Sequence, residues 1–223
     1  MGAEAPREGH EAKRDVIYER ILLDIICRDL PPGEQIAVGS LAERYGVGRM
    51  GVSDALFRLA LEGQVERRPR LGSIVASPSL IELQQVFHLR VQLEGQAARL
   101  AALNATEAEM TEIKEAYEGA EQVIAVRDWR ALICLDRNFH RAIANATHNR
   151  FIARILPDLQ NNALRLWHYS LPRRSPDALQ KEIEYHRAVA DAIGTRDASA
   201  AEAAMQSVLE EFPSTIRELF ADP

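Results

Sequence analysis

The sequence predicts a mainly α-helical protein in which an N-terminal winged helix-turn-helix with a small β-hairpin wing precedes an antiparallel all-helical bundle. Three observations lead to this fold class. Apolar residues with the spacing of one helix face follow a glycine break at 46–48, which is typical of a helix-turn-helix. Two short strand-like segments, 65–67 and 73–76, come next around a basic turn at 68–72. From residue 80 to 222 the sequence contains no convincing strand.

The first helix is expected over residues 13–29. Its apolar residues form one stripe, and a proline-glycine sequence at 31–33 ends it. Residues 1–12 are polar and are expected to be a disordered lead-in. The winged-helix domain then covers residues 13–77, and the character of the sequence changes at the linker 77–79. The stripe consists of Tyr18, Ile21, Leu22, Ile25 and Ile26.

The second domain is expected over residues 78–223, as helices joined by short connections that make successive helices pack antiparallel. Thr106 and Glu109 have the spacing of a capping box, which marks the start of a helix. Pro157 should kink or break the helix that contains it. The helical stretches are expected over 80–103, 106–126, 128–146, 149–169, 176–193 and 198–220.

Composition limits the classes of protein that fit this chain. The net charge is −6, but residues 44–70 hold six arginines against three acidic residues, so positive charge gathers at the helix-turn-helix and the wing. No run of 18 apolar residues occurs, which predicts no membrane span, and the polar start of the chain is unlike a secretory signal. Cys27 and Cys134 are expected to be buried free thiols in a reducing cytosol, so we expect a cytoplasmic protein.

A helix-turn-helix followed by a hairpin with a basic tip indicates DNA binding, with the second helix in the major groove of a double-stranded operator. The stretch LAERYGVGRMGVSDALFRLALEGQVERRPRLGSIV resembles the DNA-binding domain of the GntR family of bacterial transcription regulators. The sequence departs from the family pattern at Gly48, Met50, Gly51 and Ser53, where the family usually has Ser, Thr, Pro and Arg. The resemblance therefore implies the fold but not the usual operator, and it implies DNA-binding roles for Arg49, Met50, Ser53, Arg58, Arg70 and Gly72.

Three segments of the helical part carry a second resemblance. FHLRVQLEGQAARLAA (87–102), LDRNFHRAIANATHN (135–149) and EYHRAVADAIGTRDASAAEAAM (184–205) resemble the effector-binding, FCD-like domain of the FadR-type branch of GntR regulators. The resemblance implies a homodimer that binds a palindromic operator. It also implies a repressor that leaves the operator when a small carboxylate metabolite binds the helical bundle.

Asp136 and His140 lie four residues apart on one helix, so their side chains share a face, and His186 could face the same cavity from the fifth stretch. The resemblance implies a divalent metal such as Zn or Ni, held by one Asp and three His, with Val208 at the fourth position. Because the last two helices turn around near residue 197, positions 186 and 208 should lie at the same height. Three ligands leave open positions for water or an effector, whereas the alternative is a metal-free pocket in which the two histidines hydrogen-bond each other, Asp136 or a ligand.

The effector is expected to be recognised by cationic and amide side chains. Arg90 and Glu94 are four residues apart and are expected to pair as a surface or interface bridge. The resemblance makes Arg90 a candidate for holding an effector carboxylate, because a guanidinium binds carboxylates with two parallel hydrogen bonds. Arg137 and Asn161 are further candidates.

Two other functions fit parts of the sequence. A helical-bundle metalloenzyme would use Asp136, His140 and His186, with Glu182 or Glu184 as acid or base, but it leaves residues 36–76 without a role. A winged helix that serves only protein contacts would fit the missing arginine at Ser53. We favour the DNA-binding regulator, because it accounts for both parts of the chain.

Overall fold

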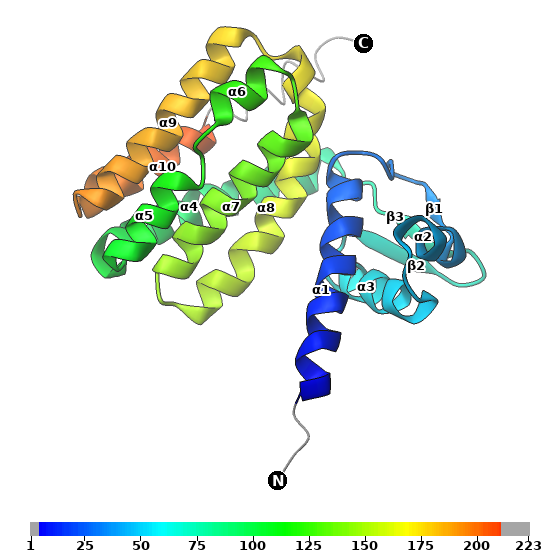
Figure 1. Ribbon diagram of the computed structural model, residues 1–223. Helices are drawn as coiled ribbons and strands as arrows, with labels where there is room; N and C mark the ends of the chain where they lie inside the picture. Colours follow the sequence, from blue (N-terminus) through cyan, green and yellow to red (C-terminus); the bar gives the residue numbers. More distant parts are fainter. Residues whose placement is uncertain (1–4, 211–223) are drawn as a thin grey trace. The chain divides into compact units, whose positions relative to one another are not determined.

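The computed structural model describes residues 5–210, with side chains described from Arg14 onward (Figure 1). The chain divides into two compact units, Met1–Pro78 and Ser79–Pro223. This division falls within the linker 77–79, where the sequence changes character.

The first unit is a winged helix-turn-helix, as the sequence predicts. Three strands form one antiparallel sheet in the order β1-β3-β2, in which Arg67 of β2 lies opposite Ser73 of β3. The first helix begins within the segment that was expected to be a disordered lead-in, because Ala, Glu and Arg in that segment favour helix. The elements are α1 (Ala5–Ile26), β1 (Gln35–Ile36), α2 (Val38–Tyr45), α3 (Arg49–Leu61), β2 (Val65–Arg68) and β3 (Gly72–Val75).

Two glycines explain how α1, α2 and α3 fit together. Gly46 ends α2 with a φ of +66°, a left-handed conformation that glycine adopts without strain, and this turns the chain into α3. Gly51 lies where α3 packs on α1, since a Cβ at this position would come within 2.7 Å of the Cδ1 atom of Ile17. A Cβ at this position, including that of the proline usual in the family, would require the end of the Ile17 side chain to shift.

The core of the first unit is built from the expected apolar faces of α1 and α3. Ile21, Leu22, Ile25 and Ile26 of α1 are fully buried. Val52, Ala55, Leu56 and Leu59 of α3 are also buried. Each large apolar side chain buried in this way contributes roughly 1.5–3 kcal/mol to the stability of the unit.

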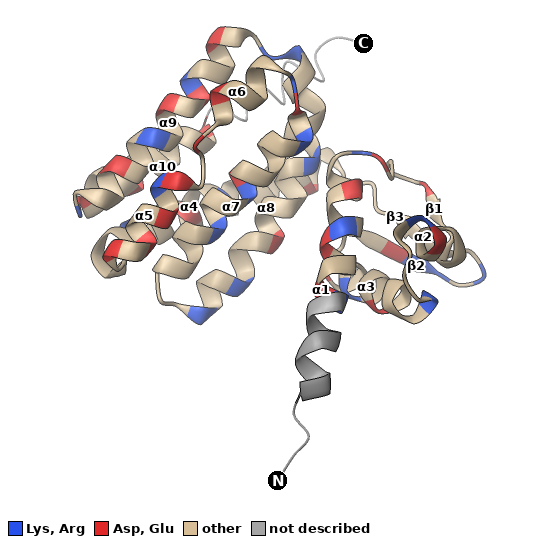
Figure 2. Cartoon of the chain, viewed as in Figure 1, with Lys and Arg blue, Asp and Glu red and all other residues tan. Residues whose placement is uncertain are grey.

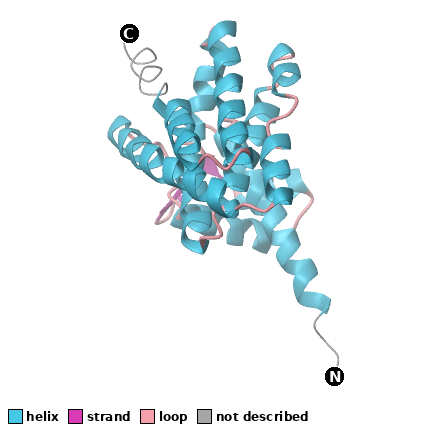
Figure 3. Cartoon of the chain, turned by 90° about the vertical axis from the view of Figure 1, so that its left-hand side faces the viewer, coloured by secondary structure: helices cyan, strands magenta, loops and turns pink. Residues whose placement is uncertain are grey.

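The second unit is helical throughout the part that the structure describes (Figure 3). The expected stretch 106–126 is two helices rather than one, because Gly119 adopts a φ of +84° immediately before the second of them. The elements are α4 (Leu80–Asn104), α5 (Glu107–Glu115), α6 (Ala120–Ala125), α7 (Trp129–Ala146), α8 (Arg150–Ser170), the 3₁₀ turn η1 (Leu171–Arg173), α9 (Pro176–Gly194) and α10 (Ala198–Glu210). The expected continuation of the last helix beyond 210 lies outside the described residues.

Two sequence expectations concern the course of individual helices. Thr106 caps α5 through the capping box with Glu109, as expected. Pro157, in contrast, does not end its helix, because α8 runs from Arg150 to Ser170 with the proline inside it. The helix continues because Asn149 caps its start and the buried face beyond the proline holds it in the bundle.

Helix α4 lies at the centre of the bundle, where it contacts α7, α8, α9 and α10. Gly95 allows α10 to approach closely, since a Cβ at this position would lie 3.2 Å from the Cγ atom of Gln206. Buried alanines on the same helix, at 97, 98, 101 and 102, continue this close packing. Among the described residues, no helix has the length and hydropathy needed to cross a membrane.

Candidate functional site

The outward side of α3 carries the residues that the sequence assigned to DNA reading. Arg49, Met50 and Ser53 are all exposed, and the Met50 side chain is 74% exposed. The guanidinium of Arg49 lies beside Gly39 at the start of α2, 3.5 Å from the place where a Cβ on that residue would be. The first turn of α3 therefore presents one arginine and one large apolar side chain to solvent.

The six arginines between residues 44 and 70 differ in how their charges are compensated. Arg44 pairs with Asp24 at 3.2 Å and Arg68 pairs with Glu66 at 2.7 Å. Arg58 pairs with Asp15 at 2.6 Å and stacks over the ring of Tyr18, so it faces α1. The guanidinium of Arg58 is therefore held by a carboxylate and an aromatic ring of α1, and its contact with DNA stays a prediction.

The remaining cations of this segment are Arg49, Arg67 and Arg70, which have no carboxylate within ion-pair distance in the described part of the chain. Arg70 lies at the tip of the wing with a φ of +66°, and Gly72 follows with a φ of +82°. Basic and acidic residues are mixed over the helices of both units (Figure 2). Arg67 is not among the DNA-binding residues expected from the sequence, although it lies in the same basic run as Arg70.

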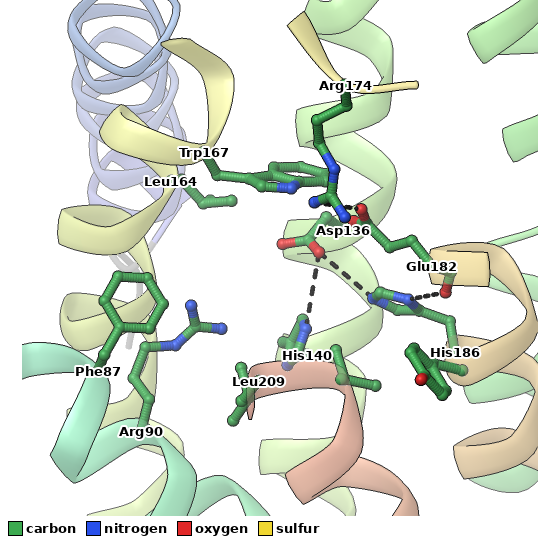
Figure 4. Close-up of a pocket in the computed structure, with 12 residues that line it drawn as sticks. Phe87, Arg90, Asp136, His140, Leu164, Trp167, Arg174, Glu182, His186 and Leu209 are labelled. Atoms are coloured by element: carbon green, nitrogen blue, oxygen red, sulfur yellow. Dashed lines mark hydrogen bonds and ion pairs between the residues drawn. The ribbon is translucent and has the colours of Figure 1, made fainter. Parts of the chain in front are cut away.

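The second candidate site is a buried polar pocket of about 40 Å³ between helices of the second unit (Figure 4). Asp136 and His140 come from α7, His186 from α9 and Val208 from α10, so the structure brings together all four positions that the sequence singled out. The pocket is lined by Phe87, Arg90, Asp136, His140, Leu164, Trp167, Arg174, Glu182, Tyr185, His186, Val208 and Leu209.

Asp136, His140 and His186 form a compact buried group within this pocket. One ligand atom from each lies within 4.8 Å of the others. The Oδ1 atom of Asp136 lies 3.4 Å from Nε2 of His186 and 3.6 Å from Nε2 of His140. The separation of these atoms leaves room for a cation between them, and it is longer than a strong hydrogen bond.

The other atoms of these three residues are fixed by neighbouring groups. His186 donates from Nδ1 to the carbonyl oxygen of Glu182 at 2.8 Å, and its ring stacks on Tyr117 with the centroids 4.0 Å apart. Gln160 donates to Oδ2 of Asp136 at 2.9 Å. Because the outer atoms of His186 and Asp136 are engaged in this way, Nε2 of the histidine and Oδ1 of the carboxylate face the centre of the group (Figure 4).

Behind the group lies a buried chain of charges formed by Arg90, Glu94 and His140. Nε of Arg90 donates to Oε1 of Glu94 at 2.5 Å, and Oε2 of Glu94 forms an ion pair with Nδ1 of His140. Burial alone would raise the pKa of Glu94, but the charges of Arg90 and His140 outweigh burial and lower it to about 2. The expected Arg90–Glu94 pair exists, but it is buried rather than on the surface, because α4 is the central helix.

The charge state of the pocket follows from the same contacts. Burial alone would lower the pKa of His186, but the adjacent carboxylate of Asp136 raises it. For Asp136 itself, burial acts to raise the pKa, while His140 and His186 lower it below the ordinary value. Asp136 and His186 therefore each favour the charged form of the other.

Two expected effector residues lie outside the pocket lining. Arg137 donates from Nε to Oδ1 of Asn161 at 3.1 Å, so these two side chains bind each other. Arg174 was missed by the sequence analysis, yet it lines the pocket and pairs with Glu182 at 2.9 Å. No sequence signal pointed to it, because Arg174 lies in the connection between η1 and α9, where helical periodicity gives no information.

A winged helix with exposed, uncompensated arginines, joined to a helical domain with a buried polar pocket, defines a two-domain DNA-binding regulator that responds to a ligand. The family comparisons agree with this class. Residues 13–75 match the family described as bacterial regulatory proteins, gntR family, and residues 85–211 match the FCD domain. The chain belongs to the GntR family of bacterial regulators, in the group that carries an FCD domain.

Relatives with names of the same kind cover nearly the whole chain. The HTH-type transcriptional repressor RspR of Escherichia coli (strain K12) is 25% identical over 203 residues, which cover 91% of this chain and 88% of that protein. The HTH-type transcriptional regulator LutR of Bacillus subtilis (strain 168) is 25% identical over 217 residues, which cover 87% of this chain and 96% of that protein. The structure of McbR/YncC from E. coli covers 93% of this chain and 98% of its own, with a TM-score of 0.82 at 20% identity.

These findings decide between the functions that the sequence left open. The chain is a ligand-responsive, DNA-binding transcription regulator and not a helical-bundle metalloenzyme. Its winged helix belongs to a family that binds DNA operators, so a role in protein contacts alone does not fit.

Proposed function

We propose that this chain is a repressor that binds a palindromic operator as a homodimer and leaves it when a small carboxylate binds the pocket of the second unit. The observation that carries the proposal is the convergence of Arg90, Arg174 and the Asp136–His140–His186 group on one buried pocket. Such a pocket selects a compact anionic ligand, because buried guanidinium groups bind carboxylates through charge-assisted hydrogen bonds.

We assign a divalent metal such as Zn or Ni to Asp136, His140 and His186. A carboxylate and two imidazoles are a donor set that both metals accept, and the outer nitrogen of each histidine is already engaged, by Glu94 or by a backbone carbonyl. A bound metal would supply positive charge to which an effector carboxylate can coordinate. Val208 lines the pocket at the expected fourth position, and because valine cannot coordinate, that position stays available to water or to the effector.

We assign the binding of the effector carboxylate to Arg174 rather than to Arg90. Both line the pocket, but Arg90 is held by Glu94. The negative charge of Glu94 is needed there, because it lies between the buried side chains of Arg90 and His140. Arg174 is held by Glu182, and burial, only partly offset by Arg174, raises the pKa of Glu182. An effector carboxylate can therefore replace Glu182 at Arg174 at a lower cost than it can replace Glu94 at Arg90.

A two-fold operator follows from the size of the DNA-binding unit. One winged helix buries too little surface for high specificity, whereas a homodimer doubles the contacts and reads a two-fold sequence. The second unit, which carries most of the negative charge of the chain, supplies the surface for dimerisation.

The proposal is tested by letting the purified protein select DNA from two sources. One is a random pool of sequences, and the other is the region upstream of its own gene. We expect a palindromic sequence, bound by one dimer in light scattering and gel-shift experiments. A panel of small mono- and dicarboxylates, with and without added Zn or Ni, should then contain at least one compound that releases the DNA. A monomer that binds one half-site tightly, or a protein that no carboxylate releases, would contradict the proposal.

A further inference from the structure

A hollow separates the reading helix α3 from the wing at the position where the usual arginine of the family is replaced by Ser53. Its volume is about 440 Å³, and it is open to solvent on one side. Because serine is short, the space beside it is not filled by a side chain of α3. The hollow is lined by Ile36, Val38, Ser53, Leu56, Arg67, Arg68, Pro69, Gly72 and Ser73.

Arg67 lies at this hollow because of the alternation of side chains along β2. Val65 and Arg67 are two residues apart and project from the same face of the strand. Val65 is buried in the core that α3 shares with the sheet. The Arg67 side chain therefore projects on the α3 side of the strand, just beyond the edge of this core. The guanidinium carbon of Arg67 lies 5.8 Å from the ring centroid of Phe57, which is an exposed residue of α3.

The neighbouring arginine provides an internal comparison. Arg68 also borders the hollow, but its Nε and Nη2 atoms both bind Oε2 of Glu66, at 2.9 and 2.7 Å. Arg67 makes no ion pair among the described residues, and its contact with Phe57 leaves the charge uncompensated. Two adjacent arginines of the wing thus differ in available charge, although the sequence alone does not distinguish them.

We propose that Arg67, positioned by Phe57, binds a phosphate of the DNA backbone at the hollow beside Ser53 and supplies the positive charge that this chain lacks at position 53. Arg49 on α3 and Arg70 at the wing tip carry the other uncompensated charges of this segment, so Arg67 adds a third cation on β2. A phosphate fits this place better than a base edge, because the guanidinium is carried by the wing strand rather than by the reading helix. The inference rests on the DNA-binding function of the family and deepens it by one contact.

The test measures how binding depends on salt, because each phosphate contact contributes about 0.9 to the slope of log Kd against log salt concentration. A mixed-sequence 30-base-pair duplex is used, so no operator needs to be known. We expect Arg67→Ala to lower the slope by about one for each bound subunit. The matched control Arg68→Ala should leave the slope nearly unchanged, because Glu66 already neutralises that arginine.

Three further variants test the positioning role of Phe57 and the place of the contact. Phe57→Leu should weaken binding by part of the Arg67→Ala effect, whereas Phe57→Tyr, which keeps the ring, should bind like the wild type. Ser53→Arg in the Arg67→Ala background should restore the slope, because it places a guanidinium at the same hollow. All four positions are exposed, so circular dichroism should show unchanged folding.

Equal slopes for Arg67→Ala and Arg68→Ala, or an unchanged slope for Arg67→Ala, would overturn the assignment. A wild-type protein that binds no mixed-sequence duplex at low salt would overturn it as well. The proposed repressor function fails by a different result, namely that the wild type binds duplex DNA but selects no operator from the random pool.

Discussion

Glu94 and His140 face each other in the interior of the helical unit, where the carboxylate of one pairs with Nδ1 of the other. This contact links the pocket to α4, the helix that holds the bundle together. It also fixes the orientation of the imidazole ring, because with Nδ1 against Glu94 the Nε2 atom is the one that faces Asp136. Glu94 is thus tied both to the stability of the second unit and to its ability to bind a metal.

The first prediction concerns acid stability. The folded pKa of Glu94, about 2, lies below its ordinary value of 4.5, so its contribution to stability is present above about pH 4.5 and is lost as the pH falls toward 2. Glu94→Gln should lower the free energy of unfolding by about 3–5 kcal/mol at pH 7, because Arg90 is left buried without its carboxylate. The difference from the wild type should shrink in urea melts between pH 4.5 and 2.5.

Glu202 offers a matched control for this measurement. It pairs with Arg99 at 3.5 Å near the surface, so Glu202→Gln should change stability by less than about 1 kcal/mol. If Glu94→Gln behaved like this control, the charge chain behind the pocket would carry no net stabilisation.

The second prediction concerns metal binding. Val208→His should raise the affinity for Zn or Ni, because it adds an imidazole at the position that lines the pocket beside His186. His140→Ala should abolish binding, and Val208→Ala, which opens space without adding a ligand, should leave it unchanged. Metal content and thermal shift are measured for the wild type and the three variants, before and after treatment with a chelator.

The pH dependence of metal binding has a definite sign. Because the pKa of His186 is raised beside Asp136, a metal must displace a proton from the pocket, and its affinity should fall as the pH drops through the histidine range. A wild-type protein that binds no metal, and whose Val208→His variant gains none, would leave the pocket as a purely organic effector site.

The third prediction concerns the reading helix and the wing. Arg49→Ala should cost about 1–3 kcal/mol of specific binding and relax the sequence preference, because the first turn of α3 reaches base edges. Arg70→Ala should instead weaken binding to all sequences and lower the salt slope. Arg58→Ala is the control, since Arg58 is held by Asp15 and Tyr18 and should affect stability more than DNA affinity. Quantitative gel shifts against the selected operator and a scrambled duplex separate these effects.

The features that sequence could predict are those set by local periodicity. The apolar stripe of α1 and the shared face of Asp136 and His140 follow from the 3.6-residue repeat of a helix, which any packing must respect. The pairing of positions 186 and 208 follows from the short turn between two antiparallel helices, and both residues line one pocket in the structure.

The features that sequence could not predict depend on contacts between distant segments. Arg58 has the spacing and exposure expected of a DNA contact, but its partner Asp15 is 43 residues away in the chain. The spacing of Arg90 and Glu94 predicts their ion pair, but only the packing of the bundle around α4 determines that it is buried. Arg67 and Arg68 look equivalent in sequence, and only the folded structure shows that Glu66 compensates the charge of Arg68.

The last prediction concerns the response to the effector. Arg174→Gln should keep operator affinity but require roughly 10-fold or more carboxylate for release, because a charge-assisted hydrogen bond contributes about 1.5–3 kcal/mol. Glu182 would then be buried without its cation, so the double variant Arg174→Gln, Glu182→Gln checks that the loss does not come from destabilisation. Arg173→Gln is the neighbouring control, since Arg173 is exposed and binds the carbonyl oxygen of Tyr169 at 2.8 Å. Fluorescence anisotropy of labelled operator DNA, titrated with a carboxylate that releases the wild type, gives the midpoint for each protein. A normal response in both Arg174 variants would mean that the carboxylate is held by Arg90 or by a metal at Asp136, His140 and His186.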